Sequence, residues 1–315
     1  MSGIIYFVVP CYNEQEVLPE TSKRLLNKLQ SLISSGKADD SSRILFVDDG
    51  SRDETWNIIS GLTEQDSHFA GVRLSRNRGH QNALLAGLTV AKDRCVAAIS
   101  MDADLQDDID AVDSMIDNFE EGCDIVYGVR SSRKKDTAFK RGTAGAFYKL
   151  MRQLGVDIVD NHADYRLMSQ RAIEALLLFE ESNLFLRGIV PQIGFKSAIV
   201  TYERQQRFAG ESKYPLKKML YFAFDGITSF SIKPIRLVTL SGAVIFSISM
   251  LAMVVLLLQK LMGYTVQGWT TLMGSIWALG GIQLLSLGII GEYIGKIYQE
   301  TKRRPRFIID HIDIR

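Results

Sequence analysis

Residues 95–108, Cys95-Val-Ala-Ala-Ile-Ser-Met-Asp102-Ala-Asp104-Leu-Gln-Asp-Asp108, join an apolar run to a cluster of carboxylates. A short, continuous apolar run of this kind is typical of a buried parallel strand. Because unpaired carboxylates are costly to bury, the acidic residues must lie at the carboxyl end of that strand. Ligands of open α/β sheets bind at this edge, so the stretch predicts a ligand site there.

The spacing of Asp102 and Asp104 suits a hard divalent cation. Carboxylate oxygens supply negative charge, and the phosphate oxygens of a substrate complete the coordination shell. The stretch therefore predicts a Mg²⁺ or Mn²⁺ site that holds a diphosphate. The alternative is a solvated acidic turn, with Asp107 and Asp108 in the first turn of the next helix.

Apolar runs and helical patterns alternate along the first half of the chain. Strands are expected at 4–10, 43–48, 72–74, 95–101 and 124–129, with helices between them. This alternation predicts an α/β fold, in which helices flank a mostly parallel sheet. No Gly-x-Gly-x-x-Gly follows the first strand and no Gly-x-x-x-x-Gly-Lys-Ser/Thr is present, which argues against a dinucleotide or P-loop site.

The second strand also ends in acidic residues. Asp48 and Asp49 fall at the same sheet edge as Asp102, so a ligand role is favoured over simple turn formation. Ser51 and Glu54 have the spacing of a capping box for the helix that follows.

Charge and cysteine content restrict the class of protein. The 37 Lys and Arg residues nearly balance the 36 Asp and Glu residues, which gives no support for a nucleic-acid partner. Cys11, Cys95 and Cys123 lie in apolar sequence without metal-type spacing and are expected to be reduced core thiols. His80 is interpreted as a loop residue and not as a metal ligand.

Two segments near the carboxyl end lack charge. Residues 237–258 and 268–291 contain no Asp, Glu, Lys or Arg, and each exceeds the about 20 residues needed to span hydrocarbon. Two transmembrane helices are predicted, against the alternative of two buried helices in a soluble domain. Basic residues flank the pair on both outer sides, so both ends should face the cytoplasm. No signal peptide precedes the first strand, which places residues 1–230 in the cytosol.

These patterns divide the chain into four parts. Residues 1–214 form the expected cytoplasmic domain, which holds the predicted ligand site. Residues 215–233 predict an amphipathic helix at the membrane interface, with a soluble-domain helix as the alternative. Residues 234–297 hold the two spans, and residues 298–315 form a basic cytoplasmic tail. The location that follows is the inner (plasma) membrane, crossed more than once.

Cations cluster in two further segments. Arg130 and Arg133 follow the strand at 124–129, which ends at the predicted ligand edge. Residues 199–214 combine Arg204, Arg207 and Lys213 with glycine and serine, a composition that suits phosphate binding.

Five motifs in order resemble one known family. They are Val9-Pro-Cys-Tyr-Asn-Glu14, Val47-Asp-Asp-Gly-Ser-Arg-Asp53, Asp102-Ala-Asp-Leu-Gln-Asp107, Ala163-Asp-Tyr-Arg-Leu167 and Gly210-Glu-Ser-Lys-Tyr214. Together with Gly226–Ser231 and Gly291–Tyr298, they are similar to family 2 inverting glycosyltransferases of the GT-A nucleotide-diphospho-sugar transferase fold. The branch resembled is that of polyisoprenyl-phosphate glycosyltransferases, typified by bactoprenol glucosyltransferases and related to dolichol-phosphate mannose synthase. Ala163 and Tyr165 stand where the family usually has Gly and Phe.

The resemblance implies a role for each matching residue. The nucleoside of the donor would lie against Pro10, Tyr12, Glu14 and Asp49. The metal and the diphosphate would be held by Asp102, Asp104 and Gln106. Asp164 is the candidate base or acceptor-orienting carboxylate, although a lipid phosphate is already a nucleophile. Phosphates would be bound by Arg130, Arg207 and Lys213, with Arg133, Arg166 and Arg204 as second choices.

The function implied is inverting transfer of one hexose, with UDP-glucose as the leading donor, to undecaprenyl phosphate at the cytoplasmic membrane face. The product would be a lipid-linked sugar for cell-envelope or O-antigen glycan modification. Candidate protein partners are a second copy of the chain, a flippase and a downstream membrane glycosyltransferase. A processive polysaccharide synthase is the alternative within the class, but no Gln-x-x-Arg-Trp motif is present. A noncatalytic nucleotide-binding scaffold is the alternative outside it, and the intact acidic motifs argue against that.

Overall fold

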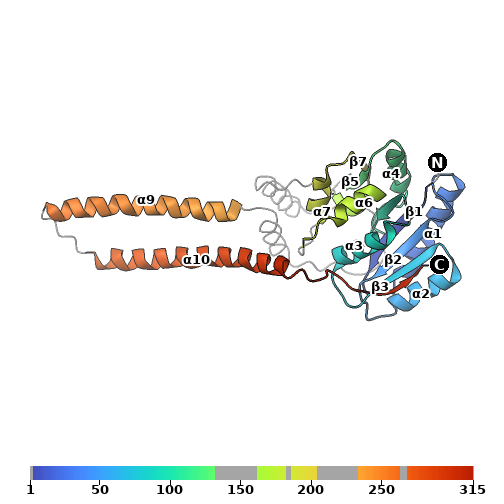
Figure 1. Cartoon of the computed structure of the whole chain (residues 1–315), viewed down its shortest axis with the longest axis horizontal. Coiled ribbons are helices and arrows are strands. Elements are labelled where there is room, and N and C mark those ends of the chain that lie inside the picture. Colours follow the sequence, from blue (N-terminus) through green and yellow to red (C-terminus); the bar gives the residue numbers. More distant parts are fainter. Residues whose placement is uncertain (1–2, 132–161, 182–185, 204–232, 263–267, 315) are drawn as a thin grey trace. The chain divides into compact units, whose positions relative to one another are not determined.

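The computed structural model describes residues 3–131, 162–181, 186–203, 233–262 and 268–314. They belong to two units (Figure 1). An α/β unit comprises Met1–Arg152, Asp157–Tyr214 and Arg304–Arg315, and a helical unit comprises Gln153–Val156 and Pro215–Arg303.

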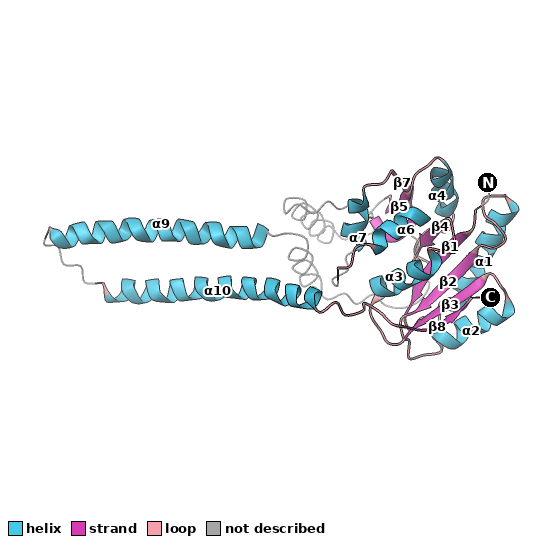
Figure 2. Cartoon of the chain, in the orientation of Figure 1, coloured by secondary structure: helices cyan, strands magenta, loops and turns pink. Residues whose placement is uncertain are grey.

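A single mixed sheet forms the centre of the α/β unit (Figure 2). Its strands are β1 (Ile5–Cys11), β2 (Arg43–Asp48), β3 (Phe69–Leu74), β4 (Ala97–Ser100), β5 (Ile125–Arg130), β6 (His162–Ser169), β7 (Ser197–Tyr202) and β8 (Ile309–Asp313), in the order β7-β5-β6-β4-β1-β2-β3-β8. β1 pairs in parallel with β2 and β4, β2 with β3, and β5 with β7. Two strands run against this direction, β6 between β4 and β5, and β8 at the edge beside β3. The predicted α/β class with a mostly parallel sheet is confirmed.

Helices cover both faces of this sheet. The unit contains α1 (Leu18–Ser34), α2 (Thr55–Gln65), α3 (His80–Ala91), α4 (Ala111–Glu120), α6 (Gln170–Leu177), α7 (Leu186–Ile189) and the 3-10 turn η1 (Val190–Ile193). Odd-numbered β1 residues such as Phe7 share one core with Leu25 of α1 and Met115 of α4. Even-numbered residues point to the opposite face, where Val8 packs under α3. The three cysteines are free and buried, as predicted.

Gly87 brings α3 close to the sheet. A Cβ at this position would lie 2.7 Å from Val47 Cγ2 and closer still to Val8. Gly87→Ala should therefore lower stability by about 1–3 kcal/mol, because overpacking outweighs the about 1 kcal/mol gain in helix propensity. Gly61→Ala on α2, where the added methyl meets open space, is the matched control and should leave stability unchanged or raise it. Thermal unfolding of the purified variants measures both, and a Gly87→Ala midpoint at or above that of Gly61→Ala would contradict this packing.

The predicted capping box at Ser51 and Glu54 is wrong. α2 begins at Thr55, one turn later than that pattern requires, and the Glu54 side chain makes no cap bond. Asp53 instead accepts from the backbone N–H of Thr55 at 3.1 Å. The Ser51 hydroxyl accepts from the backbone N–H of Asn13 at 2.9 Å, so it joins the loops that follow β1 and β2.

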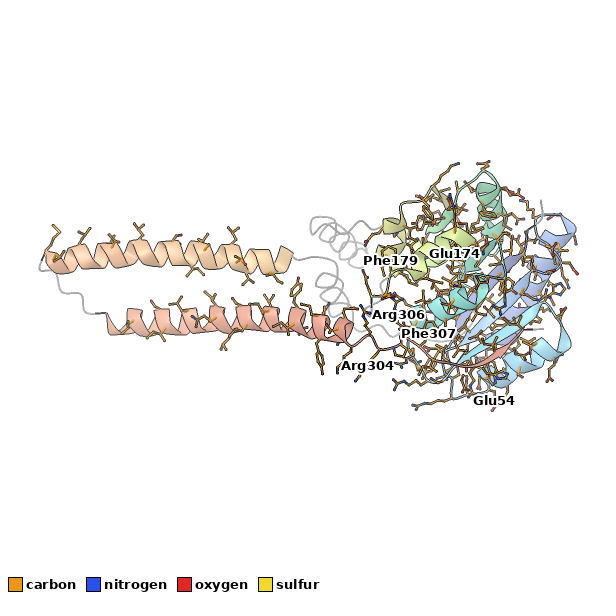
Figure 3. The ribbon with its side chains drawn as sticks, viewed as in Figure 1. Glu54, Glu174, Phe179, Arg304, Arg306 and Phe307 are labelled. Atoms are coloured by element: carbon orange, nitrogen blue, oxygen red, sulfur yellow. The ribbon has the colours of Figure 1, made fainter. Side chains whose placement is uncertain are left out.

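The predicted basic tail at 298–315 contains a strand, β8, that the sequence did not predict. β8 pairs antiparallel with β3, and Val72 is the partner of Ile312. Asp313 accepts a 2.6 Å hydrogen bond from the Thr63 hydroxyl on α2. Just before β8, Arg306 donates to the backbone carbonyl of Phe179, which follows α6 (Figure 3). The carboxyl-terminal segment is therefore part of the α/β unit.

The helical unit contains α9 (Lys233–Leu261) and α10 (Trp269–Thr301), which lie side by side and antiparallel (Figure 1). The uncharged segments at 237–258 and 268–291 fall on these two helices, except for Gly268. Among the residues that the structure describes, no helix has both the length and the hydropathy required to cross a membrane. The amphipathic segment predicted at 215–233 lies outside the described residues, apart from Lys233.

Candidate active site

The acidic motif after β4 forms a tight turn at the carboxyl edge of the sheet. Leu105 is buried and has a φ of 58°, a left-handed conformation that costs a branched residue energy. This turn lets Asp104 Oδ1 accept from the backbone N–H of Gln106 at 3.1 Å. Gln106 is itself buried. The strained backbone thus fixes the positions of Asp104 and Gln106 relative to β4.

His80 faces this motif from the start of α3. Its Nε2 lies 3.3 Å from Asp102 Oδ1 and 3.9 Å from Asp164 Oδ2. The interpretation of His80 as a loop residue is wrong, because Gly79, with a φ of 89°, ends the loop and His80 opens the helix. The sequence did carry a signal for this position of His80: Gly79, a residue typical of turns, stands directly before a helix that begins at the ligand edge.

Asp49 positions the loop that carries His80. The carboxylate is buried, and its two oxygens accept from the backbone N–H groups of Arg78, at 2.6 Å, and Gly79, at 2.8 Å. Burial raises the pKa of Asp49, while these two hydrogen bonds lower it. Both oxygens are engaged within the protein, so Asp49 shapes the site through the 78–79 loop.

Asp164 on β6 lies between two guanidinium groups. Arg166 Nη2 is 2.6 Å from Oδ1, and Arg187 Nη2 is 3.2 Å from Oδ2. Burial alone would raise the pKa of Asp164, but Arg187 and Arg166 hold it well below its usual range. A carboxylate this acidic is a poor proton acceptor at neutral pH. Arg166 is only 2 % exposed, so its guanidinium serves Asp164 and does not reach an external phosphate.

Arg130 at the end of β5 is oriented by Tyr202 and Asp107, neither of which was predicted as a site residue. Its Nε donates to the Tyr202 hydroxyl at 3.3 Å, and its Nη2 lies 3.6 Å from Asp107 Oδ1. Tyr202 in turn donates a short hydrogen bond to Asp107. Asp107 and Tyr202 lie 95 residues apart in the sequence, so no local pattern could have linked them.

The donor set of the acidic motif fits a divalent cation that a substrate phosphate helps to bind. Burial raises the pKa of Asp102 to about 6, and the nearby carboxylates of Asp107, Asp164 and Asp104 add to this rise. Such a concentration of negative charge and oxygen donors suits Mg²⁺ or Mn²⁺. Within the described ranges, no group of three or more His, Cys, Asp and Glu side chains could hold a metal ion, so Asp102 and Asp104 would need further ligands from the substrate phosphates.

A cavity of about 320 Å³ opens beside the carboxyl ends of β1, β2 and β3. It is lined by Tyr12, Gly50, Ser51, Arg52, Arg73, Leu74, Ser75, Arg76, Asn77 and Asp310. Tyr12 is 41 % exposed and can offer its ring to a nucleobase. The other predicted nucleoside residues, Pro10, Glu14 and Asp49, are not among the residues that line this cavity, and Pro10 is buried in β1. Arg133, Arg204, Arg207 and Lys213 fall outside the described residues.

Three comparisons place the chain among known proteins. The family model described as "Glycosyl transferase family 2" matches residues 6–177. The uncharacterized glycosyltransferase YkoT of Bacillus subtilis is 55% identical over 98% of this chain and 91% of its own length. The bactoprenol glucosyl transferase of Shigella phage SfV is 39% identical over 97% of both chains. Among solved structures, glucosyl-3-phosphoglycerate synthase from Mycobacterium tuberculosis, in complex with Mn²⁺, UDP and phosphoglyceric acid, matches 72% of this chain and 76% of that chain, with a TM-score of 0.44 and 17% identity.

Proposed function

This chain belongs to glycosyl transferase family 2, and from that membership we propose that it transfers a single hexose from a nucleotide sugar, with UDP-glucose as the leading donor, to undecaprenyl phosphate with inversion. The observation that carries the proposal is the length of the match to the phage bactoprenol glucosyl transferase. It extends over 97% of both chains, well beyond the region of the family model, and so includes the helical unit.

On the donor side, Asp102, Asp104 and Gln106 would hold Mg²⁺ or Mn²⁺ together with the diphosphate. When bound, the cation offsets the negative charge that develops on the departing nucleoside diphosphate. Tyr12 would support the nucleobase in the 320 Å³ cavity. The turn at Leu105 keeps the acidic motif in one conformation, which limits the reorganisation needed on binding.

On the acceptor side, Arg130 would contact a phosphate, oriented by Tyr202 and Asp107. Arg133, Arg204, Arg207 and Lys213 are proposed to complete the phosphate contacts. Because a phosphate monoester is already anionic, the reaction needs no strong base. We therefore assign Asp164 to positioning: it holds Arg187 and faces His80 beside the acidic motif.

The lipid acceptor requires a site at the membrane. Each CH₂ removed from hydrocarbon costs about 0.8 kcal/mol, so the polyprenyl chain must stay in the bilayer during transfer. We propose that residues 237–258 and 268–291 span the inner membrane, that residues 215–233 lie at its cytoplasmic interface, and that residues 1–214 face the cytoplasm. The lipid-linked sugar would then pass to a flippase and a downstream membrane glycosyltransferase for envelope glycan modification.

A transfer assay tests this function. Purified full-length protein, undecaprenyl phosphate, radiolabelled UDP-glucose and Mn²⁺ should give a glucosylated lipid phosphate, and EDTA should abolish the reaction until excess Mn²⁺ restores it. UDP-galactose, UDP-N-acetylglucosamine and GDP-mannose, run in parallel, identify the sugar. Absence of lipid product with every donor would refute the function, and full activity in EDTA would refute its dependence on metal.

A further inference from the structure

The carboxyl-terminal strand supplies one wall of the 320 Å³ cavity. Asp310 of β8 lines it together with residues that follow β1 and β2 and residues at the end of β3 and just beyond it. His311 and Asp313 face α2, because His311 packs edge-on against the Trp56 ring at 5.7 Å and Asp313 accepts from Thr63. Asp310 is the extra residue of an irregularity in β8, because Arg73 pairs with His311 and Leu74 with Ile309, and this unpaired position lines the cavity.

The charges around this cavity differ from those at the acidic motif. Three arginines line it, Arg52, Arg73 and Arg76, and Asp310 is the one carboxylate among its described lining residues. Neither of the acids that end β2 lines the cavity, although Asp48 Oδ2 lies 3.7 Å from Nε of Arg73. Asp48 accepts from the backbone N–H of Ser51 at 3.0 Å, and Asp49 binds the 78–79 loop. A ligand with both hydrogen-bond donors and acceptors on one edge would match arginines beside a single carboxylate.

We propose that Asp310 determines nucleobase specificity in the donor site, by accepting a hydrogen bond from the ring N–H of uracil or guanine. The inference rests on the proposed function, which makes this cavity the nucleoside pocket. In both bases the ring N–H lies next to a carbonyl, so the carboxylate accepts from the N–H and an arginine donates to the carbonyl. Cytosine and adenine present an unprotonated ring nitrogen instead, and two facing acceptors repel each other.

Titration calorimetry with the full-length protein and Mn²⁺ tests the assignment. The probes are UDP, GDP, CDP and ADP. Wild-type protein should bind UDP or GDP at least about tenfold more tightly than CDP and ADP, because the ring nitrogen of the mismatched bases places a second acceptor against the Asp310 carboxylate. Asp310→Asn keeps the side-chain shape but offers an N–H, so it should weaken the preferred diphosphate and strengthen CDP, which brings the two within about threefold.

Asp313→Asn is the matched control. It makes the same charge change on the same strand, and its amide oxygen can still accept from Thr63, so the nucleotide preference should stay as in the wild type. An equal shift in both variants, or an unchanged preference in Asp310→Asn, would overturn the assignment while the proposed function stands. If the wild-type protein binds no nucleoside diphosphate, the proposed function falls and the assignment falls with it.

Discussion

Asp104→Asn should lower the rate of sugar transfer by about a thousandfold. The substitution removes one anionic oxygen donor for the cation, and loss of roughly 4 kcal/mol of charge stabilisation in the transition state corresponds to that factor. In the wild-type protein Asp104 Oδ1 accepts from the backbone N–H of Gln106. The amide oxygen of the variant can still accept this bond, so the turn should be kept. Transfer kinetics to undecaprenyl phosphate measure the loss.

Asp108→Asn is the control for this result. Asp108 lies in the same loop and accepts from the backbone N–H of Asp110 at 3.0 Å, but it is not a proposed metal ligand. If the acidic motif is only a solvated turn, the two substitutions should have the same effect on the transfer rate. If it binds metal, only Asp104→Asn should lower that rate strongly. In calorimetry, Mn²⁺ should strengthen UDP binding to the wild type and to Asp108→Asn, and have little effect on Asp104→Asn. Equal transfer rates for the two variants would argue for the acidic turn.

Asp164→Ala should both destabilise the protein and stop transfer. It leaves the guanidinium of Arg166 buried without its 2.6 Å partner, and breaking a buried pair in this way costs about 3–5 kcal/mol. Arg187 also loses the carboxylate that holds it beside His80. Thermal unfolding and transfer kinetics measure the two effects separately.

The double variant Asp164→Ala with Arg166→Met distinguishes stability from function. Removing the buried charge should recover much of the lost stability, because a well-packed apolar pair can replace a buried ion pair. Transfer should remain impaired, because the carboxylate between Arg187 and His80 is still missing. Wild-type transfer in the stabilised double variant would show that Asp164 matters only for folding.

The low pKa of Asp164 gives the sign of its pH dependence. The folded-state pKa lies below that of the unfolded chain, so the carboxylate stabilises the fold fully above about pH 4. That contribution is lost only as the pH falls from there toward the folded-state pKa. The difference in stability between wild type and Asp164→Asn should therefore be constant from pH 5 to 8 and shrink below pH 4.

Local sequence predicted the parallel strands β1 to β5, because a strand buried on both faces is largely apolar, but it did not predict β7, half of whose residues are exposed. β1, β2 and β4 lie where the apolar runs occur, and the acids after β2 and β4 lie at one edge of the sheet. The order of strands was not readable, because it depends on distant pairings. β6 inserts antiparallel between β4 and β5, and β8 reads Ile-Asp-His-Ile-Asp, which is too short and polar to indicate a strand.

In the candidate site, too, local sequence predicted some residues, whereas others depend on distant pairings. Asp102 and Asp104 were predicted as site residues from the break between an apolar run and an acidic cluster, and the structure places them at the carboxyl end of β4. His80, Arg187 and Tyr202 act on residues that are distant in sequence, such as Asp164 and Asp107, and only the fold brings them together. Asp49 was predicted at the right edge, but its carboxylate faces the 78–79 loop and not the cavity.

The position of β8 affects the order of events during biosynthesis. Thr63 and Asp313 lie 250 residues apart, and the ribosome needs roughly 10 to 50 s to add that length of chain. Until then the edge of β3 has no partner strand, and an open edge is prone to pair with other chains. The 320 Å³ cavity also gains Asp310 only after α9 and α10 have been translated. A nascent chain therefore completes this cavity only after both helices have been synthesised, so the proposed donor site would form only after the helical unit has been translated.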